Sequence, residues 1–149
     1  MKTKIILAAI GLTLAQFSFA HSEQHAKKPN QQANFIQEEW GIGANKKEVS
    51  RTIVIKMTDK MRFSPEKLDV RLGETIRFEV KNDGKVMHEM VIGTKPILDK
   101  HAELMLKNPN MEHDEPYMAH VSPGKTGEII WKFNRKGDFD FACLMAGHY

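Results

Sequence analysis

The sequence contains a single cysteine, Cys143, among its 149 residues. A disulfide within one chain is therefore excluded, because a bridge needs two thiols. Long hydrophobic runs are also scarce. The apolar stretch from Ile5 to Phe19 is interrupted by polar residues and falls short of the roughly 20 apolar residues of a spanning helix. No basic stripe interleaved with aromatic residues is present, so nucleic acid is not an expected partner.

Residues 1–20 have the features of a secretory signal peptide. Lys2 and Lys4 precede the apolar stretch, and Ser18-Phe19-Ala20 places small residues at the two positions that a signal peptidase recognises. The sequence thus predicts an exported, periplasmic protein whose mature chain begins at His21 and spans no membrane. Without the two lysines the 22 basic residues fall to 20 against 19 acidic ones, a net charge of +1.

Export makes the single cysteine informative, because exported proteins meet an oxidising compartment where cysteines usually form pairs. In such a place one thiol is buried and inert, bonded to another chain, or protected by a bound metal. The length predicts one domain. Residues 21–50 are polar and show no helical or strand periodicity, so we expect a flexible leader followed by a domain over residues 51–149.

The pattern after residue 50 predicts an all-β domain with strands connected in antiparallel fashion. Alternating or β-branched segments end at glycine-rich or Asn-Asp-Gly turns, as in a Greek-key β-sandwich. Helical spacing of apolar residues predicts one short helix, at residues 97–108, in an excursion between Pro96 and Pro123. The expected strands are Arg51–Met57, Lys67–Leu72, Glu74–Val80, Val86–Ile92, Gly127–Phe133 and Asp138–Cys143.

The strongest chemical signal lies at the end of the chain, where four residues separate Cys143 from His148 directly after an apolar strand. A second imidazole, His88, stands in another apolar strand, where burial without a partner would be costly. Two imidazoles and one thiolate suit copper. Alternatively, His88 is a core histidine and Cys143 a small hydrophobe. Zinc would want a fourth protein ligand or a catalytic water, and no general base lies near the cysteine loop.

Five segments carry a resemblance to a known family: Arg51–Ile55, Gly73–Phe78, Gly84–Gly93, Pro123–Thr126 and Phe139–Tyr149. They resemble the cupredoxins, and in particular exported azurin- or plastocyanin-like proteins associated with copper tolerance in bacteria. The resemblance covers about residues 50–149. It implies a cupredoxin-like β-sandwich with one type 1, or blue, copper ion held by His88, Cys143 and His148.

Two departures from that family stand out. Its axial ligand, usually a Met a few residues after the second His, and its final strand have no counterpart before Tyr149. Either the sequence is a fragment, or copper is three-coordinate or completed by water or by the carbonyl of Met87. In addition, Glu89 stands where several relatives carry an Asn that ties the two ligand loops together, which puts that hydrogen bond in doubt.

Further metal-binding side chains gather in the excursion between the two prolines. Thioethers and imidazoles bind Cu(I), so the sequence predicts a second, weaker copper site there, against the alternative that Met105 packs the helix and the histidines are solvated. A free N-terminal His21 would also chelate Cu(II). The residues of the second cluster are His101, Met105, Met111, His113, Met118 and His120.

Together these features predict a monomeric copper-binding protein rather than an enzyme, which serves one-electron transfer, copper tolerance or both and has a redox or copper-transfer protein as its partner. The alternative is a copper-tolerance protein that sequesters or delivers copper through the excursion, without an electron-transfer role. A third hypothesis, a copper enzyme built on His21, conflicts with the polar leader around that residue.

Overall fold

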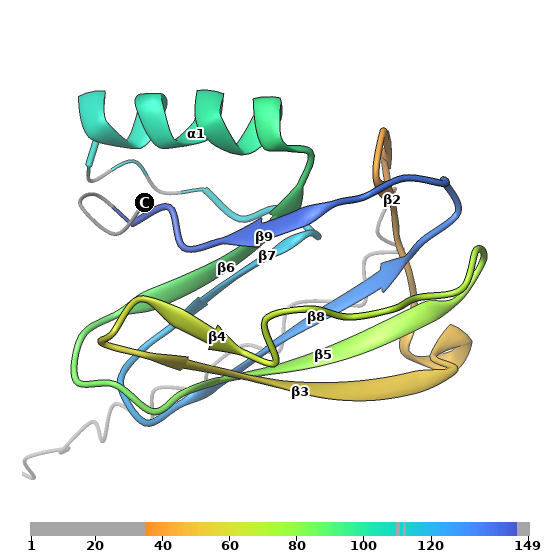
Figure 1. Cartoon of the computed structure of the whole chain (residues 1–149), viewed down its shortest axis with the longest axis horizontal. Coiled ribbons are helices and arrows are strands. Elements are labelled where there is room, and N and C mark those ends of the chain that lie inside the picture. The colour runs from red at the N-terminus through yellow and green to blue at the C-terminus, as the bar shows by residue number, and fades with distance from the viewer. Residues whose placement is uncertain (1–34, 110, 112, 146–149) are drawn as a thin grey trace, which may run out of the picture. The chain divides into compact units, whose positions relative to one another are not determined.

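Two β-sheets and one α-helix make up residues 35–109, 111 and 113–145, which the computed structural model describes. Figure 1 shows the sheets stacked, with the helix beyond the smaller one. In this part of the chain no helix combines the length and the apolar character needed to cross a membrane. The elements are β1 (Gln37–Glu38), β2 (Gly41–Gly43), the 3-10 helix η1 (Lys46–Glu48), β3 (Arg51–Thr58), β4 (Arg62–Ser64), β5 (Thr75–Asn82), β6 (His88–Gly93), α1 (Lys95–Lys107), β7 (Met118–Val121), β8 (Thr126–Lys132) and β9 (Asp140–Ala142).

The larger sheet has six strands in the order β1-β2-β8-β5-β3-β4. β5 pairs antiparallel with β8, but its pairing with β3 is parallel, so the expectation of antiparallel connections throughout is wrong. The predicted strand at Lys67–Leu72 is also wrong, and the shorter β4 precedes it. Leu68 and Val70 pack against the core while their neighbours are exposed. The alternation therefore reflects one-sided burial and not strand pairing.

The smaller sheet has three strands in the order β7-β6-β9, and it faces the larger one across the main core. The predicted two-sheet sandwich is confirmed. Every residue of β6 is buried because both faces of the strand are covered. Met90 and Ile92 face the core between the sheets, while Val91 lies in a second apolar cluster with residues of α1. β7 falls within the excursion and was not expected.

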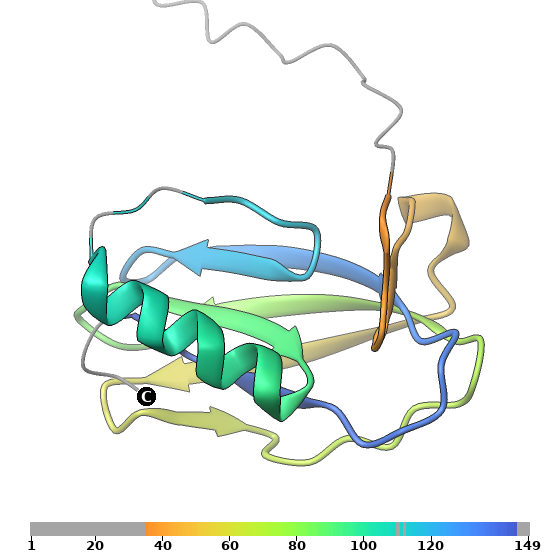
Figure 2. The same cartoon turned by 90° about the horizontal axis from the view of Figure 1, so that it is seen from above.

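The helix α1 confirms the prediction for residues 97–108 within two residues at its start and one at its end. A proline at the beginning of the helix fits there because the first turn has no intrahelical acceptor for its missing N–H. Leu98, Ala102 and Met105 are buried, and Leu98 and Ala102 belong to the apolar cluster with Val91. Figure 2 shows α1 lying across this sheet and the following segment returning to β7.

The predicted flexible leader is wrong over its described part, residues 35–50, which contain two strands and a 3-10 helix. Trp40 is 2% exposed and joins the main core. Its ring meets Tyr117 edge-on at 5.1 Å and stacks near Trp131 at 6.3 Å, in the arrangements that aromatic pairs favour. The segment is thus attached to the sandwich both by the packing of Trp40 and by the pairing of β2 with β8. Residues 1–34, including the predicted signal peptide and His21, lie outside the described residues.

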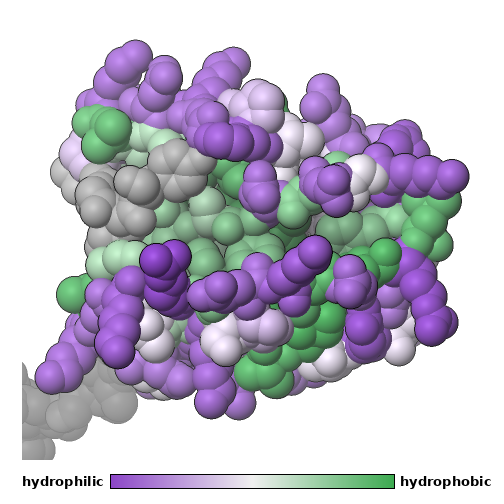
Figure 3. All heavy atoms as spheres, viewed as in Figure 1, coloured by the Kyte–Doolittle hydropathy of each residue, from purple (hydrophilic) through white to green (hydrophobic). Residues whose placement is uncertain are grey.

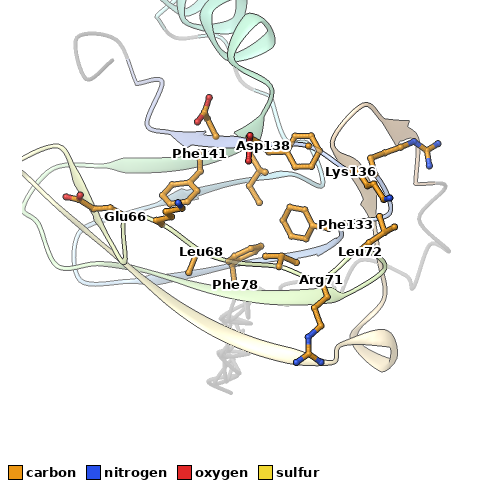
Figure 4. Close-up of a pocket in the computed structure, with 16 residues that line it drawn as sticks. Glu66, Leu68, Arg71, Leu72, Phe78, Phe133, Lys136, Asp138 and Phe141 are labelled. Atoms are coloured by element: carbon orange, nitrogen blue, oxygen red, sulfur yellow. The ribbon is translucent and has the colours of Figure 1, made fainter.

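One side of the sandwich is hollowed between the two sheets, where β4 and β9 form the sheet edges. Phe63 and Phe141 meet edge-on across this gap at 5.1 Å. Figure 3 shows a hydrophobic band along it, with hydrophilic residues on both sides. Figure 4 shows Leu68, Phe78, Phe133 and Phe141 around the hollow and charged side chains at its margin, among them Glu66, Arg71, Lys136 and Asp138.

Replacing Trp40 by Ala should lower the free energy of unfolding by about 3–5 kcal/mol, because a buried aromatic side chain leaves a cavity. Glu39→Ala, at the exposed neighbouring position, should change it by less than about 0.5 kcal/mol. Urea denaturation of both variants measures the difference. Equal stabilities would show that the side chain of Trp40 contributes nothing to the core.

Candidate metal centre

His88 and Cys143, 55 positions apart in the chain, lie side by side in the structure. Nδ1 of His88 is 3.8 Å from Sγ of Cys143. His88 begins β6, and Cys143 directly follows β9, which pairs with β6 in antiparallel register. The third predicted ligand, His148, lies outside the described residues. The structure thus brings together the two members of the predicted set that it describes.

The turn before β6 is fixed by the side chain of Asn82, which is buried. Its Nδ2 donates to the carbonyls of Val86 and Val121, at 2.8 and 2.7 Å. Its Oδ1 accepts a hydrogen bond from the N–H of Gly84 at 2.8 Å. A buried amide with three partners holds a loop in one conformation, because breaking any bond leaves a polar group unsatisfied. Asn82 therefore sets where His88 enters the sheet.

Asp59, which the sequence did not single out, orients the ring of His88. Its Oδ1 lies 3.0 Å from Nε2 of His88, and the carboxylate also accepts the N–H of Lys85 at 2.8 Å. Hydrogen bonds from Lys85 and His88 hold the pKa of Asp59 below its usual range. An ionised carboxylate accepts only, so Nε2 of His88 carries the proton and the Nδ1 lone pair faces the thiol.

Gly84 makes the contact between Asp59 and His88 sterically possible. A Cβ at position 84 would overlap the carboxylate of Asp59. Asp59 and Gly84 lie in different turns, far apart in the sequence, so no short sequence motif contains both.

Cys143 is 7% exposed, and burial raises the pKa of its thiol. The backbone N–H of Glu89 points at the sulfur, 3.4 Å away, and the N–H of Met145 also lowers the pKa, while the charge of Glu89 raises it. The thiol is therefore protonated at neutral pH when no cation is near. The N–H donors stabilise the thiolate once a metal ion displaces the proton.

Glu89 ties the two ligand segments together, so the doubt about this hydrogen bond is resolved in its favour. Its Oε1 accepts the N–H of Leu144 at 2.9 Å, and its own N–H meets the sulfur of Cys143. A carboxylate oxygen accepts as an amide oxygen does. Unlike an amide, it also brings charge: burial raises the pKa of Glu89, partly offset by the neighbouring His120.

Three histidines of the second predicted cluster, His101, His113 and His120, lie together. Nε2 of His101 lies 2.8 Å from Nε2 of His113, and the His113 ring is 5.2 Å from that of His120. Met105 and Met118 are buried, at 2% and 4% exposure, and Met118 belongs to the apolar cluster with Val91 and Leu98. That these methionines bind copper together with the histidines stays a prediction. The sequence also missed Glu89 as a neighbour of the histidines.

The geometry of His88 and Cys143 fits one bound metal ion. Two ligand atoms at about 2.0 and 2.3 Å from an ion, the lengths of zinc bonds to nitrogen and sulfur, lie about 3.7 Å apart at a trigonal angle of about 120°. The observed separation of Nδ1 and Sγ is 3.8 Å. A thiolate with imidazole nitrogens in trigonal arrangement is the donor set of a blue-copper site.

Comparison with known proteins gives a consistent result. Residues 5–148 match the family of the cupredoxin-like domain. The chain is 37% identical to the copper-resistant cuproprotein CopI of Rubrivivax gelatinosus, over 100% of this chain and 93% of that protein. It is 30% identical to the CopI of Pseudomonas aeruginosa, over 74% of this chain and 76% of the relative.

Two solved structures show the same fold. Auracyanin from Roseiflexus castenholzii matches with a TM-score of 0.58 at 21% identity, over 68% of this chain and 90% of its own. An azurin from Methylomonas sp. strain J matches with a TM-score of 0.51 at 15% identity, over 68% of this chain and 92% of its own.

Replacing Asp59 by Ala should release the ring of His88, so that the metal-free protein shows both neutral imidazole tautomers instead of the one protonated at Nε2. Asp83→Ala, at an exposed position in the neighbouring turn, should leave the tautomer unchanged. Nitrogen-15 chemical shifts of the imidazole measure both. A His88 ring protonated at Nδ1 in the unmodified, metal-free protein would contradict the role of Asp59.

Proposed function

The chain belongs to the cupredoxin family, among the copper-resistant cuproproteins CopI, and on this premise we propose that His88, Cys143 and His148 hold one type 1 copper ion. The single observation that carries the proposal is the 3.8 Å approach of Nδ1 of His88 to Sγ of Cys143. The family consists of non-enzymatic copper proteins, as the sequence predicted.

Each residue around the site has a definite task in this proposal. Asp59 keeps the His88 lone pair directed at the metal position, and Asn82 fixes the turn that carries His88. Glu89 and Met145 direct N–H groups at the Cys143 sulfur. Met90, at 0% exposure, helps to exclude water, whereas Met87 is 42% exposed beside the site. Such supporting contacts orient the ligands and set the affinity and reduction potential of a bound metal.

The proposed role is one-electron transfer, copper tolerance, or both. A bound copper ion would supply a redox couple between Cu(II) and Cu(I), and the covalent thiolate of Cys143 offers an electron a path out of the protein. Tolerance is suggested by the relatives, which are described as copper-resistant. The predicted signal peptide places the protein in the periplasm, where a redox or copper-transfer protein would be its partner and the chain a monomer.

The second candidate role is sequestration or delivery of copper without electron transfer. The observation that favours it is the group of three histidines beside the first site, which an electron carrier does not need. Met105 is buried, so a test on the histidines alone avoids damage to the core.

Adding Cu(II) to the protein should produce an intense thiolate-to-copper absorption band in the visible region, because the Cys143 sulfur would be a ligand. Cys143→Ser should abolish the band and Ser122→Ala, an exposed hydroxyl control, should keep it. Visible absorption spectra of the wild type and of both variants measure the band. A wild-type protein that takes up copper without this band would refute the proposed site.

In cells, the double variant His101→Ala/His113→Ala should lower copper tolerance and leave the thiolate band intact, if the second role is correct. Growth at graded copper concentrations measures this, with Lys100→Ala, an exposed position on α1, as the control. Unchanged tolerance would exclude sequestration through this group of histidines.

A further inference from the structure

The outer face of the smaller sheet, beneath α1, carries four ionisable side chains from four parts of the chain. Glu89 lies on β6 and His120 on β7, and the two are direct partners in the antiparallel register. His101 comes from α1, and His113 from the segment that follows it. Ligand atoms of Glu89, His113 and His120 all lie within 4.8 Å of one another, and His101 touches His113. We call these four residues the histidine cluster.

Hydrogen bonds set which ring nitrogens can accept a cation. Nδ1 of His113 lies 3.0 Å from the carbonyl oxygen of Met111, and a carbonyl only accepts, so Nδ1 carries the proton. Nε2 of a neutral His113 is therefore a lone pair. It accepts a hydrogen bond from Nε2 of His101 at 2.8 Å. The proton between these two rings occupies a position that a metal ion would take in a loaded site.

Glu89 is the most costly member of the cluster if no cation is present. The residue is 0% exposed. Its Oε2 makes no hydrogen bond within the described residues, although Nε2 of His120 lies 2.9 Å away in an ion-pair contact. A buried carboxylate oxygen with this single contact is unfavourable, since its lost hydration is only partly replaced. A metal ion between Oε2 and the imidazoles would compensate for that loss.

The donor set selects the kind of ion. Three imidazole nitrogens and one carboxylate oxygen suit borderline divalent ions, and at such a site Cu(II) binds more tightly than other first-row ions. Cu(I) prefers sulfur, and the four donors of the histidine cluster include no sulfur. The cluster therefore differs from the Cu(I) site that the sequence predicted.

Glu89 also connects the cluster to the first site. Its Oε1 accepts the N–H of Leu144 and its backbone N–H meets the sulfur of Cys143, while Oε2 faces His120. A cation bound at Oε2 changes the charge of the Glu89 side chain. Oε1 and the backbone N–H of the same residue contact Leu144 and Cys143. Occupation of one site should thus be detectable at the other.

We propose that Glu89, His113 and His120, with His101 as the fourth donor, form a second metal site that binds Cu(II) and is coupled to the thiolate site through Glu89. The coupling rests on the proposed function, whereas the site itself does not. Copper is then held in two chemically different places on opposite faces of one strand.

The test titrates the full chain with Cu(II) and follows bound copper per protein together with the thiolate band. The unmodified chain should bind one equivalent more than the double variant His113→Ala/His120→Ala, which should keep the band. His25→Ala, a histidine outside the cluster, should behave as the unmodified chain. Thermal melts of the metal-free variants establish that each is folded.

Equal copper binding by the double variant and the unmodified chain would overturn the second site. If the unmodified chain binds the additional equivalent of copper but shows no thiolate band, the site at His88, Cys143 and His148 is refuted and the histidine cluster is not. Glu89→Gln keeps an acceptor for Leu144 but removes the charge, and it should weaken Cu(II) binding at the cluster by about tenfold or more. Unchanged affinity in this variant would exclude Glu89 as a ligand.

The coupling between the two metal sites is measured separately, through the thiolate band. Filling the cluster after the thiolate site should shift the energy or intensity of the thiolate band in the unmodified chain, and not in the double variant. A band that is insensitive to the second equivalent would overturn the coupling through Glu89.

Discussion

Both sites depend on β6, the central strand of the smaller sheet, which pairs with β9 on one side and with β7 on the other. The pairing with β9 places the segment after β9 against the start of β6, where Nδ1 of His88 and Sγ of Cys143 come within 3.8 Å. Side chains alternate across a strand, so neighbouring residues serve opposite faces. His88 faces the interior with Met90, and Glu89 faces the layer under α1 with Val91. One buried strand thus supplies a residue to each site.

Burial strengthens the polar contacts at both sites. Within a protein, a hydrogen bond or a charge acts more strongly than in water, and an unpaired polar group costs more. The His88 ring is buried, and the exposed carboxylate of Asp59 fixes its tautomer. The N–H of Glu89 stabilises a thiolate that burial alone would disfavour. The same burial raises the pKa of Glu89, whose second oxygen has only the contact with His120, so a cation there would stabilise its charge. A helix that packs on the sheet through Leu98 and Ala102 is what shields that face.

Much of the sandwich could be predicted from the sequence, because alternating segments, turn residues and the helical spacing each have a local signal. The predictions that failed concern features set by long-range contacts: the segment around Trp40 joins the core and pairs with β8, and Leu68 and Val70 alternate without pairing. His88 and Cys143 were predictable as rare residue types in apolar strands. Asp59 was not, since its role needs a turn 29 positions from the histidine that it contacts. Glu89 joins the histidines only through the register with His120.

X-ray absorption spectroscopy at the copper edge, on the protein loaded with one equivalent of copper, examines the central claim most directly. The account predicts one sulfur neighbour together with imidazole nitrogens around the metal. A copper environment of nitrogen and oxygen atoms alone would contradict it, whatever else the protein binds.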